Sequence, residues 1–137
     1  MTEFESKIVA IRRNSEEVFR VLSDFRQFTP FIPTDKLEGW EAQEDSCSFS
    51  VTGIGQTGLK IIDKEPFKTV KITGDGKLPF EFFLWIQLNE VAPGDTRMKL
   101  TLKAELNMML KMMLEKKLEE GINIMAEGIA AAFNKGG

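Results

Sequence analysis

SVTGIGQTGLKII, residues 50–62, is the stretch that decides the fold of this chain. Its glycines, Gly53, Gly55 and Gly58, spell the G-x-G-x-x-G pattern of dinucleotide-binding loops. That pattern needs a buried strand before it and a helix that opens within it, so that the pyrophosphate lies at the helix N-terminus. Pro66 follows too soon to leave room for such a helix. The stretch therefore predicts a β-hairpin rather than a nucleotide site.

Strand-like segments separated by turns surround this hairpin. Residues 47–52 alternate apolar and polar side chains, which is typical of a half-buried antiparallel strand. Turns such as Gly74-Asp75-Gly76 and Pro93-Gly94-Asp95 separate the segments. We expect strands at 37–44, 46–54, 57–65, 68–74, 79–91 and 96–106. The short connections between them imply hairpins, and hence an antiparallel meander.

The N-terminal part of the chain predicts one strand followed by two short helices. Residues 3–12 alternate so that one face holds Phe4, Ser6, Ile8 and Ala10. Asn14 and Glu17 have the spacing of a capping box, which predicts a helix start, and Val18, Phe19 and Leu22 form its buried stripe. A short aromatic turn of helix, broken by two prolines, follows at residues 25–33.

Residues 107–134 predict a long C-terminal helix. Its apolar side chains recur at helical spacing, at Leu110, Met113, Leu114, Leu118, Ile122, Met125, Ile129 and Phe133. One amphipathic helix must then cover the apolar face of a large curved antiparallel sheet of about seven strands. We therefore expect an α+β fold in which the sheet wraps around this helix, and such an arrangement easily leaves a cavity between the two.

Composition excludes several classes of function. The net charge of −3 and the pI near 5.1 give no basic surplus, so we expect no nucleic-acid partner. The chain has no histidine and no tyrosine, which removes Ser-His-Asp and Cys-His arrangements and any His-ligated metal site. Cys47 has no base to activate it and is expected to be a small buried hydrophobe. We expect no metal and no cofactor.

The sequence also carries expectations about location. One cysteine cannot form an internal disulfide, which fits a reducing cytoplasm. The opening residues, MTEFESKIVAIRRN, contain no apolar segment typical of a signal peptide. No apolar run is long enough to span a bilayer, so we expect a cytoplasmic protein that is not integral to a membrane.

Several stretches together resemble one known family. They are residues 15–24 (SEEVFRVLSD), the aromatic turn from Phe28 through Pro33, the glycine-rich hairpin at 53–58, and the C-terminal helix. In order and length the whole chain, 1–137, resembles a single domain of the START-like, Bet v 1-like superfamily, also called SRPBCC or polyketide cyclase/lipid-transport proteins. The resemblance implies the helix-grip fold with an apolar cavity, which binds or transports lipids, sterols, polyketides or other apolar molecules.

The same resemblance leaves the chemistry open. Some members of the superfamily are cyclases, dehydratases or hydrolases, but there is no universal catalytic motif, so no catalytic residue is carried over. Our leading hypothesis is binding of an apolar or amphipathic small molecule, or lipid, without catalysis. One alternative is a cyclase- or dehydratase-like enzyme that uses a pocket carboxylate. Another alternative is a protein–protein interaction module.

Apolar residues on the sheet and the helix are the candidate ligand-binding residues. The expected cavity wall consists of Phe28, Phe31, Trp40, Phe49, Val51, Phe82, Leu84, Leu100, Met109, Met113 and Met125. Ordinary core packing is the alternative for each of them. The methionines at 108, 109, 112 and 113 suit a gate over a promiscuous pocket. Gap-filling core is the alternative, and a membrane-touching patch helped by Lys111, Lys116 and Lys117 is a third.

Strand 79–91 carries a second candidate surface. Phe83 and Trp85 fall on the face opposite to the other apolar residues of that strand. An exposed Phe-Trp pair predicts an interface, with a homodimer as its simplest form; the alternative is a bulge that turns one ring inward. Glu81, Asp63 and Lys60 are the only polar anchors or acids that the sequence offers for the cavity, and surface charge is the alternative for each.

Overall fold

The structure is a computed structural model that describes residues 1–31, 37–51, 55–76 and 78–135. The strands are β1 Thr2–Glu5, β2 Val9–Ile11, β3 Leu37–Ala42, β4 Ser46–Val51, β5 Gly55–Glu65, β6 Thr69–Gly74, β7 Phe82–Ala92 and β8 Asp95–Ala104. The helices are α1 Ser15–Leu22 and α2 Met108–Asn134, with two 3₁₀ turns, η1 Phe25–Gln27 and η2 Thr29–Phe31, after α1. The predicted α+β order of elements is confirmed.

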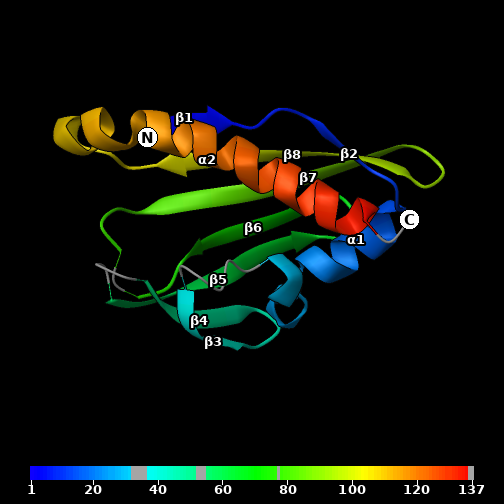
Figure 1. Ribbon diagram of the computed structural model, residues 1–137, viewed down its shortest axis with the longest axis horizontal. Helices are drawn as coiled ribbons and strands as arrows, with labels where there is room; N and C mark the ends of the chain where they lie inside the picture. Colours follow the sequence, from blue (N-terminus) through cyan, green and yellow to red (C-terminus); the bar gives the residue numbers. More distant parts are fainter. Residues whose placement is uncertain (32–36, 52–54, 77, 136–137) are drawn as a thin grey trace.

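One open antiparallel sheet contains all eight strands, in the order β1-β8-β7-β6-β5-β4-β3, with β2 also paired to β8. From β3 to β8 each strand pairs with the next along the chain, so the predicted meander is confirmed. Figure 1 shows α2 crossing one face of this sheet. The helix packs on β1, β2 and β8 at one side of the sheet and on η2, so its footprint does not extend evenly over the meander.

The predicted first strand is wrong in one respect, because a bulge divides it in two. Phe4 lies opposite Leu102 and Val9 lies opposite Met98, so five steps along the N-terminal strand match four along β8. One extra residue turns every later side chain to the other face of the sheet. Phe4 is therefore buried as expected, whereas Ile8 is 66% exposed. This division also explains why the sheet has eight strands rather than about seven.

The start of α1 is as predicted. The Asn14 side chain accepts a hydrogen bond from the backbone N–H of Glu17 at 2.8 Å, which caps the first turn. The buried residues of this helix are Val18, Phe19 and Leu22, as predicted. The aromatic turn that follows is seen as η1 and η2, while Ile32 and Pro33 lie outside the described residues.

The glycine-rich stretch forms a hairpin, as predicted. Val51 at the end of β4 lies opposite Gly55 at the start of β5, and β5 then continues as a strand to Glu65. Gly55 has φ +97°, a conformation that favours glycine. Gly53 lies outside the described residues. Because a strand and not a helix follows Gly58, this stretch lacks the helix N-terminus that a pyrophosphate needs.

Gly58 has a packing role that gives a testable prediction. A Cβ at this position would stand 2.5 Å from the Cys47 carbonyl oxygen and 2.8 Å from that of Asp75, and backbone atoms cannot yield easily. We expect Gly58→Ala to lower the free energy of unfolding by about 1–3 kcal/mol in urea denaturation. Gly121→Ala in α2 is the control: nothing lies within 4 Å of its Cβ, so it should gain up to about 1 kcal/mol. A neutral Gly58→Ala would contradict the close approach.

Candidate functional site

The concave face of the sheet, which looks toward α2, is apolar but unevenly covered. Leu100 of β8 is fully buried, as are Met98 and Ala104 on the same strand. Other predicted wall residues are only half-buried; they are Trp40, Phe49, Val51, Phe82 and Leu84. Leu59 and Leu102 are half-buried on the same face. The apolar face is therefore closed where α2 packs on β8 and partly open toward β3, β4 and β5.

Aromatic rings line two parts of this region. Trp40 of β3 stacks on Phe49 of β4, with ring centroids 5.9 Å apart and planes 26° from parallel. Phe28 and Phe31, from the turns after α1, continue a series of ring contacts that runs from Phe25 to Phe133 of α2. The structure thus brings Phe31 to the C-terminal end of α2 and brings Trp40 to Phe49, two groupings that the sequence alone did not establish.

The methionines of α2 do not lie where the sequence predicted. Met113 and Met125 were expected on the buried stripe, but they are 62% and 47% exposed, and Met109 is 70% exposed. The row that faces the sheet runs instead through Leu114, Leu118, Ile122 and Ala126. Met113 and Met125 each precede a member of this row by one residue, which rotates the side chain by about 100° around the helix. A role of these methionines in ligand binding stays a prediction.

The proposed polar anchors are all on the surface. Lys60, Asp63 and Glu81 are exposed in the structure. Sequence reasoning missed a different polar residue, Thr57 of β5, which is 5% exposed and lies opposite Phe49 in the sheet. Its hydroxyl oxygen is buried and has no hydrogen-bond partner among the described residues. The alternation of β4 and β5 could have placed Thr57 on the concave face, but only coordinates reveal that its hydroxyl is unpaired.

Two hollows lie on the surface of the molecule. One of about 320 Å³ lies between the end of β6 and the start of β7, where Gly74, Gly76, Leu78 and Phe82 form part of its wall. The other, about 450 Å³, follows the exposed flank of α2 beside Met112 and Glu115. The predicted cavity between the sheet and α2 stays a prediction.

The outer face of the sheet carries Phe83 and Trp85, both half-buried. No bulge interrupts β7 between Phe82 and Glu90, so both rings point away from the core, as one of the two hypotheses required. The ammonium of Lys71 lies 4.8 Å from the Phe83 centroid and 4.9 Å from the Trp85 centroid, and Lys103 lies 5.5 Å from the latter. Lysine side chains therefore cover part of an aromatic pair that the sequence predicted as an open patch.

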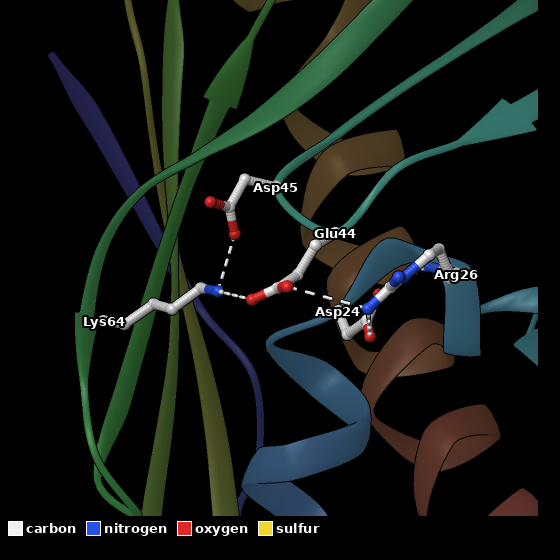
Figure 2. Close-up of polar contacts among 5 residues, drawn as sticks. All are labelled: Asp24, Arg26, Glu44, Asp45 and Lys64. Carbon is white, nitrogen blue, oxygen red and sulfur yellow. Dashed lines mark hydrogen bonds and ion pairs between the residues drawn. The ribbon is translucent and has the colours of Figure 1, made fainter.

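A charged cluster fastens the β3–β4 hairpin to its surroundings (Figure 2). The Arg26 guanidinium bonds Asp24 at 2.8–2.9 Å and reaches Glu44 at 3.6 Å, while Lys64 of β5 pairs with Glu44 at 3.2 Å and with Asp45 at 2.6 Å. The backbone N–H of Phe25 also donates to the Glu44 carbonyl, at 3.0 Å. The cluster holds the hairpin that carries Trp40 and Phe49 against the turn after α1.

This cluster predicts a dependence of stability on pH. The hydrogen bonds from Arg26 hold the pKa of the Asp24 carboxyl below its usual range. A lowered pKa contributes stability above the unfolded pKa of about 4, and this contribution is lost as the pH falls through the lower, folded value. We expect Asp24→Asn, which keeps the capping geometry, to cost about 0.5–1 kcal/mol at pH 7. The difference should shrink below pH of about 4 in thermal scans; a constant difference would contradict the ionic origin.

This region offers few side chains that could act in catalysis or bind a metal ion. Cys47 is buried, as expected, and its burial raises the pKa of the thiol to about 11, which disfavours the thiolate. Within the described ranges, no three Asp, Glu, Cys or His side chains gather where they could hold a metal ion.

Among the helices of the described ranges, none is long and apolar enough to cross a membrane.

Comparisons with known proteins identify the fold. No family model matches the sequence, and no curated protein matches it. A START superfamily protein from Mycobacterium smegmatis is similar in structure, with a TM-score of 0.69, 12% identity, and coverage of 98% of this chain and 99% of that one. The Aha1 dimer from Colwellia psychrerythraea is also similar, with a TM-score of 0.69 and 15% identity. The match covers 99% of this chain and 98% of that one.

A third similar solved structure belongs to a protein of a biosynthetic pathway. The di-domain ARO/CYC BexL from the BE-7585A biosynthetic pathway has a TM-score of 0.72 at 11% identity, and the match covers 98% of this chain and 46% of that one. Identities this low establish the fold and nothing finer. The predicted α+β helix-grip fold is confirmed, and the chain is similar in fold to a START superfamily protein and to part of an ARO/CYC protein.

Proposed function

We propose that this protein binds an apolar or amphipathic small molecule between the concave face of its sheet and α2, without catalysing a reaction. One observation carries the proposal: several apolar side chains on the concave face, beside a buried core, are only half-buried, namely those of Trp40, Phe49, Val51, Phe82 and Leu84. A cluster of partly exposed apolar side chains on a concave surface is typical of a ligand site.

An apolar ligand fits this part of the concave face best. Among the described residues, α2 packs mainly on β1, β2 and β8 and has no packing of similar extent on β3, β4 or β5. Covering that surface gains roughly 25 cal/mol per Å² of apolar area removed from water. Trp40 and Phe49 supply a flat stacked pair of rings, and aromatic ligands associate with such surfaces by stacking.

The enzyme alternative has no specific observation in its favour. A cyclase- or dehydratase-like mechanism would need a carboxylate held in the site with a raised pKa. Glu81 and Asp63 are exposed, and no Asp or Glu in the part of the chain that the structure describes is buried. The likeness to the ARO/CYC protein, at 11% identity, assigns no reaction to this chain.

We also propose a cytoplasmic location for this protein. Its single cysteine, Cys47, is buried and free, which fits a reducing compartment.

Dye binding tests the proposal directly. We expect N-phenyl-1-naphthylamine, an uncharged dye, to brighten on mixing with the purified protein and to be displaced by dodecanoic acid or by 2-naphthol. Native mass spectrometry of gently purified protein should show an additional small-molecule mass. A protein that neither brightens the dye nor carries any such mass would overturn the proposal.

Assembly as a homodimer through Phe83 and Trp85 extends the proposal. Both rings face outward and stay partly exposed, and the similar Aha1 structure is described as a dimer. We expect light scattering to give twice the mass of one chain for the wild type and a single chain for Phe83→Lys. Ser48→Lys adds the same charge on the outer face of β4 and should stay dimeric. A monomeric wild type would remove the interface.

A further inference from the structure

We propose that the hydroxyl of Thr57 is the polar anchor of the ligand site, so that the ligand is a flat aromatic molecule bearing a hydroxyl or carbonyl group. This inference rests on the proposed binding function and narrows the class of ligand. Thr57 lies on β5, directly opposite Phe49 of β4, and therefore on the concave face. Its side chain is 5% exposed, and the oxygen is closed to solvent.

The unpaired hydroxyl is unusual within this protein. Three other buried hydroxyls, those of Ser6, Thr96 and Thr101, are paired: Thr96 donates to the Arg13 carbonyl at 2.8 Å, and Thr101 bonds Gln87 at 2.8 Å. Ser6 accepts from the backbone N–H of Leu100 at 2.9 Å. A buried hydroxyl without a partner destabilises the fold, and valine would fill the same space without that cost. Among the described residues, the Thr57 hydroxyl therefore has no structural partner that would explain its presence.

The neighbours of Thr57 give the shape of the missing partner. Phe49, its cross-strand neighbour, stacks with Trp40, and the two rings form a flat apolar wall next to the hydroxyl. Gly76 lies on the other side, where a Cβ would be 3.5 Å from the Thr57 Cα. Gly76 also forms part of the wall of the hollow of about 320 Å³ between β6 and β7. A flat ring system with one polar group matches a flat wall with one free hydroxyl.

The chemistry needs an oxygen on the ligand. A threonine hydroxyl donates one hydrogen bond and can accept others, so it can pair with a phenolic hydroxyl or a carbonyl. Lys60, the lysine nearest to Thr57 along β5, is exposed and falls on the other face of the sheet, so it does not supply a cation beside the hydroxyl. A neutral polar group is therefore a better match than a carboxylate.

A matched pair of probes tests the inference. The molecules 2-naphthol and 2-methylnaphthalene have nearly the same size, but only the first carries a hydroxyl. We expect the wild type to bind 2-naphthol about tenfold more tightly, as measured by displacement of the naphthylamine dye, which corresponds to one hydrogen bond to an otherwise unpaired group. Thr57→Val should abolish this preference and leave the affinity for 2-methylnaphthalene unchanged. Thr57→Ser should keep the preference.

Thr101→Val is the control, because Thr101 is a buried threonine whose hydroxyl is already paired with Gln87. It should keep the wild-type preference. Thr57→Val should not lower Tm; a lower Tm would show that the hydroxyl has a structural partner and would overturn the inference. A wild type that binds both probes equally, or a Thr57→Val variant that keeps the preference, would overturn it while leaving the proposed function intact. Failure of every probe to displace any dye would instead overturn the proposed function.

Discussion

Leu84→Trp is expected to reduce the affinity for N-phenyl-1-naphthylamine at least tenfold while lowering the free energy of unfolding by less than about 1 kcal/mol. Leu84 of β7 is half-buried on the concave face, where the proposed ligand would lie. An indole that enters unfilled space removes the room for a ligand, and it meets few atoms that must move. Dye titration and urea denaturation of the same preparation measure both quantities.

Leu100→Trp is the matched control for this prediction. Leu100 lies on the neighbouring strand and the same face, but it is fully buried. Extra volume in a well-packed core typically costs 1–3 kcal/mol or more. Equal losses of stability in the two variants, with no dye bound by the wild type, would show that the concave face is a solid core and that the binding function is wrong. Met113→Trp is uninformative for this purpose, because that side chain is exposed.

Alternation and turn residues predicted most of the sheet. The segment expected at 96–106 is β8, Asp95–Ala104, and its predicted wall residue Leu100 lies on the concave face and is buried. The meander was also predictable, because short turns permit only antiparallel neighbours. The false nucleotide motif could be rejected from its context alone, since glycines serve close backbone approach at Gly58 as readily as they serve phosphates.

The two errors, on the first strand and on α2, share a physical cause. Periodicity in the sequence shows which side chains lie on the same face, but not which face is turned toward the core. One inserted residue between β1 and β2 reversed the faces of Ile8 and Ala10, and no local property of the sequence marks a bulge. On α2, Met113 and Leu114 are both apolar, and only the packing of β1, β2 and β8 decides which of them faces inward. Of the candidate site, the sheet residues were predictable, whereas the unpaired hydroxyl of Thr57 depends on the absence of neighbours in space.

The attachment of α2 is uneven along its length, and this bears on how a ligand would enter. Its C-terminal half is fixed to the edge of the sheet: Asn134 accepts from the backbone N–H of Arg12 at 2.7 Å and donates to the Ala10 carbonyl at 3.0 Å. Asn123 accepts from the backbone N–H of Lys7 at 2.7 Å, and Glu127 pairs with the Lys7 ammonium. In α2, the first fully buried side chain along the chain is that of Ile122, so the N-terminal half of the helix contains none. The N-terminal half of α2 is therefore the part that can shift to admit a ligand at the lowest cost.

Phe133→Ala is expected to lower the free energy of unfolding by about 3–5 kcal/mol, the usual cost of removing a buried aromatic ring. Phe133 is 9% exposed, and its ring centroid lies 5.7 Å from that of Phe31, so it joins the end of α2 to η2. Phe133→Leu retains most of the buried volume and should cost less than about 1.5 kcal/mol. Urea denaturation measures both.

Leu118→Ala, in the N-terminal half of the same helix, completes this comparison. Leu118 lies on the row that faces the sheet but is only half-buried, so we expect its removal to cost clearly less than that of Phe133. If Leu118→Ala destabilised the protein as much as Phe133→Ala, both halves of α2 would be fixed to the core. An entry route beneath the N-terminal half would then be excluded, because opening it would disrupt packing as costly as that around Phe133.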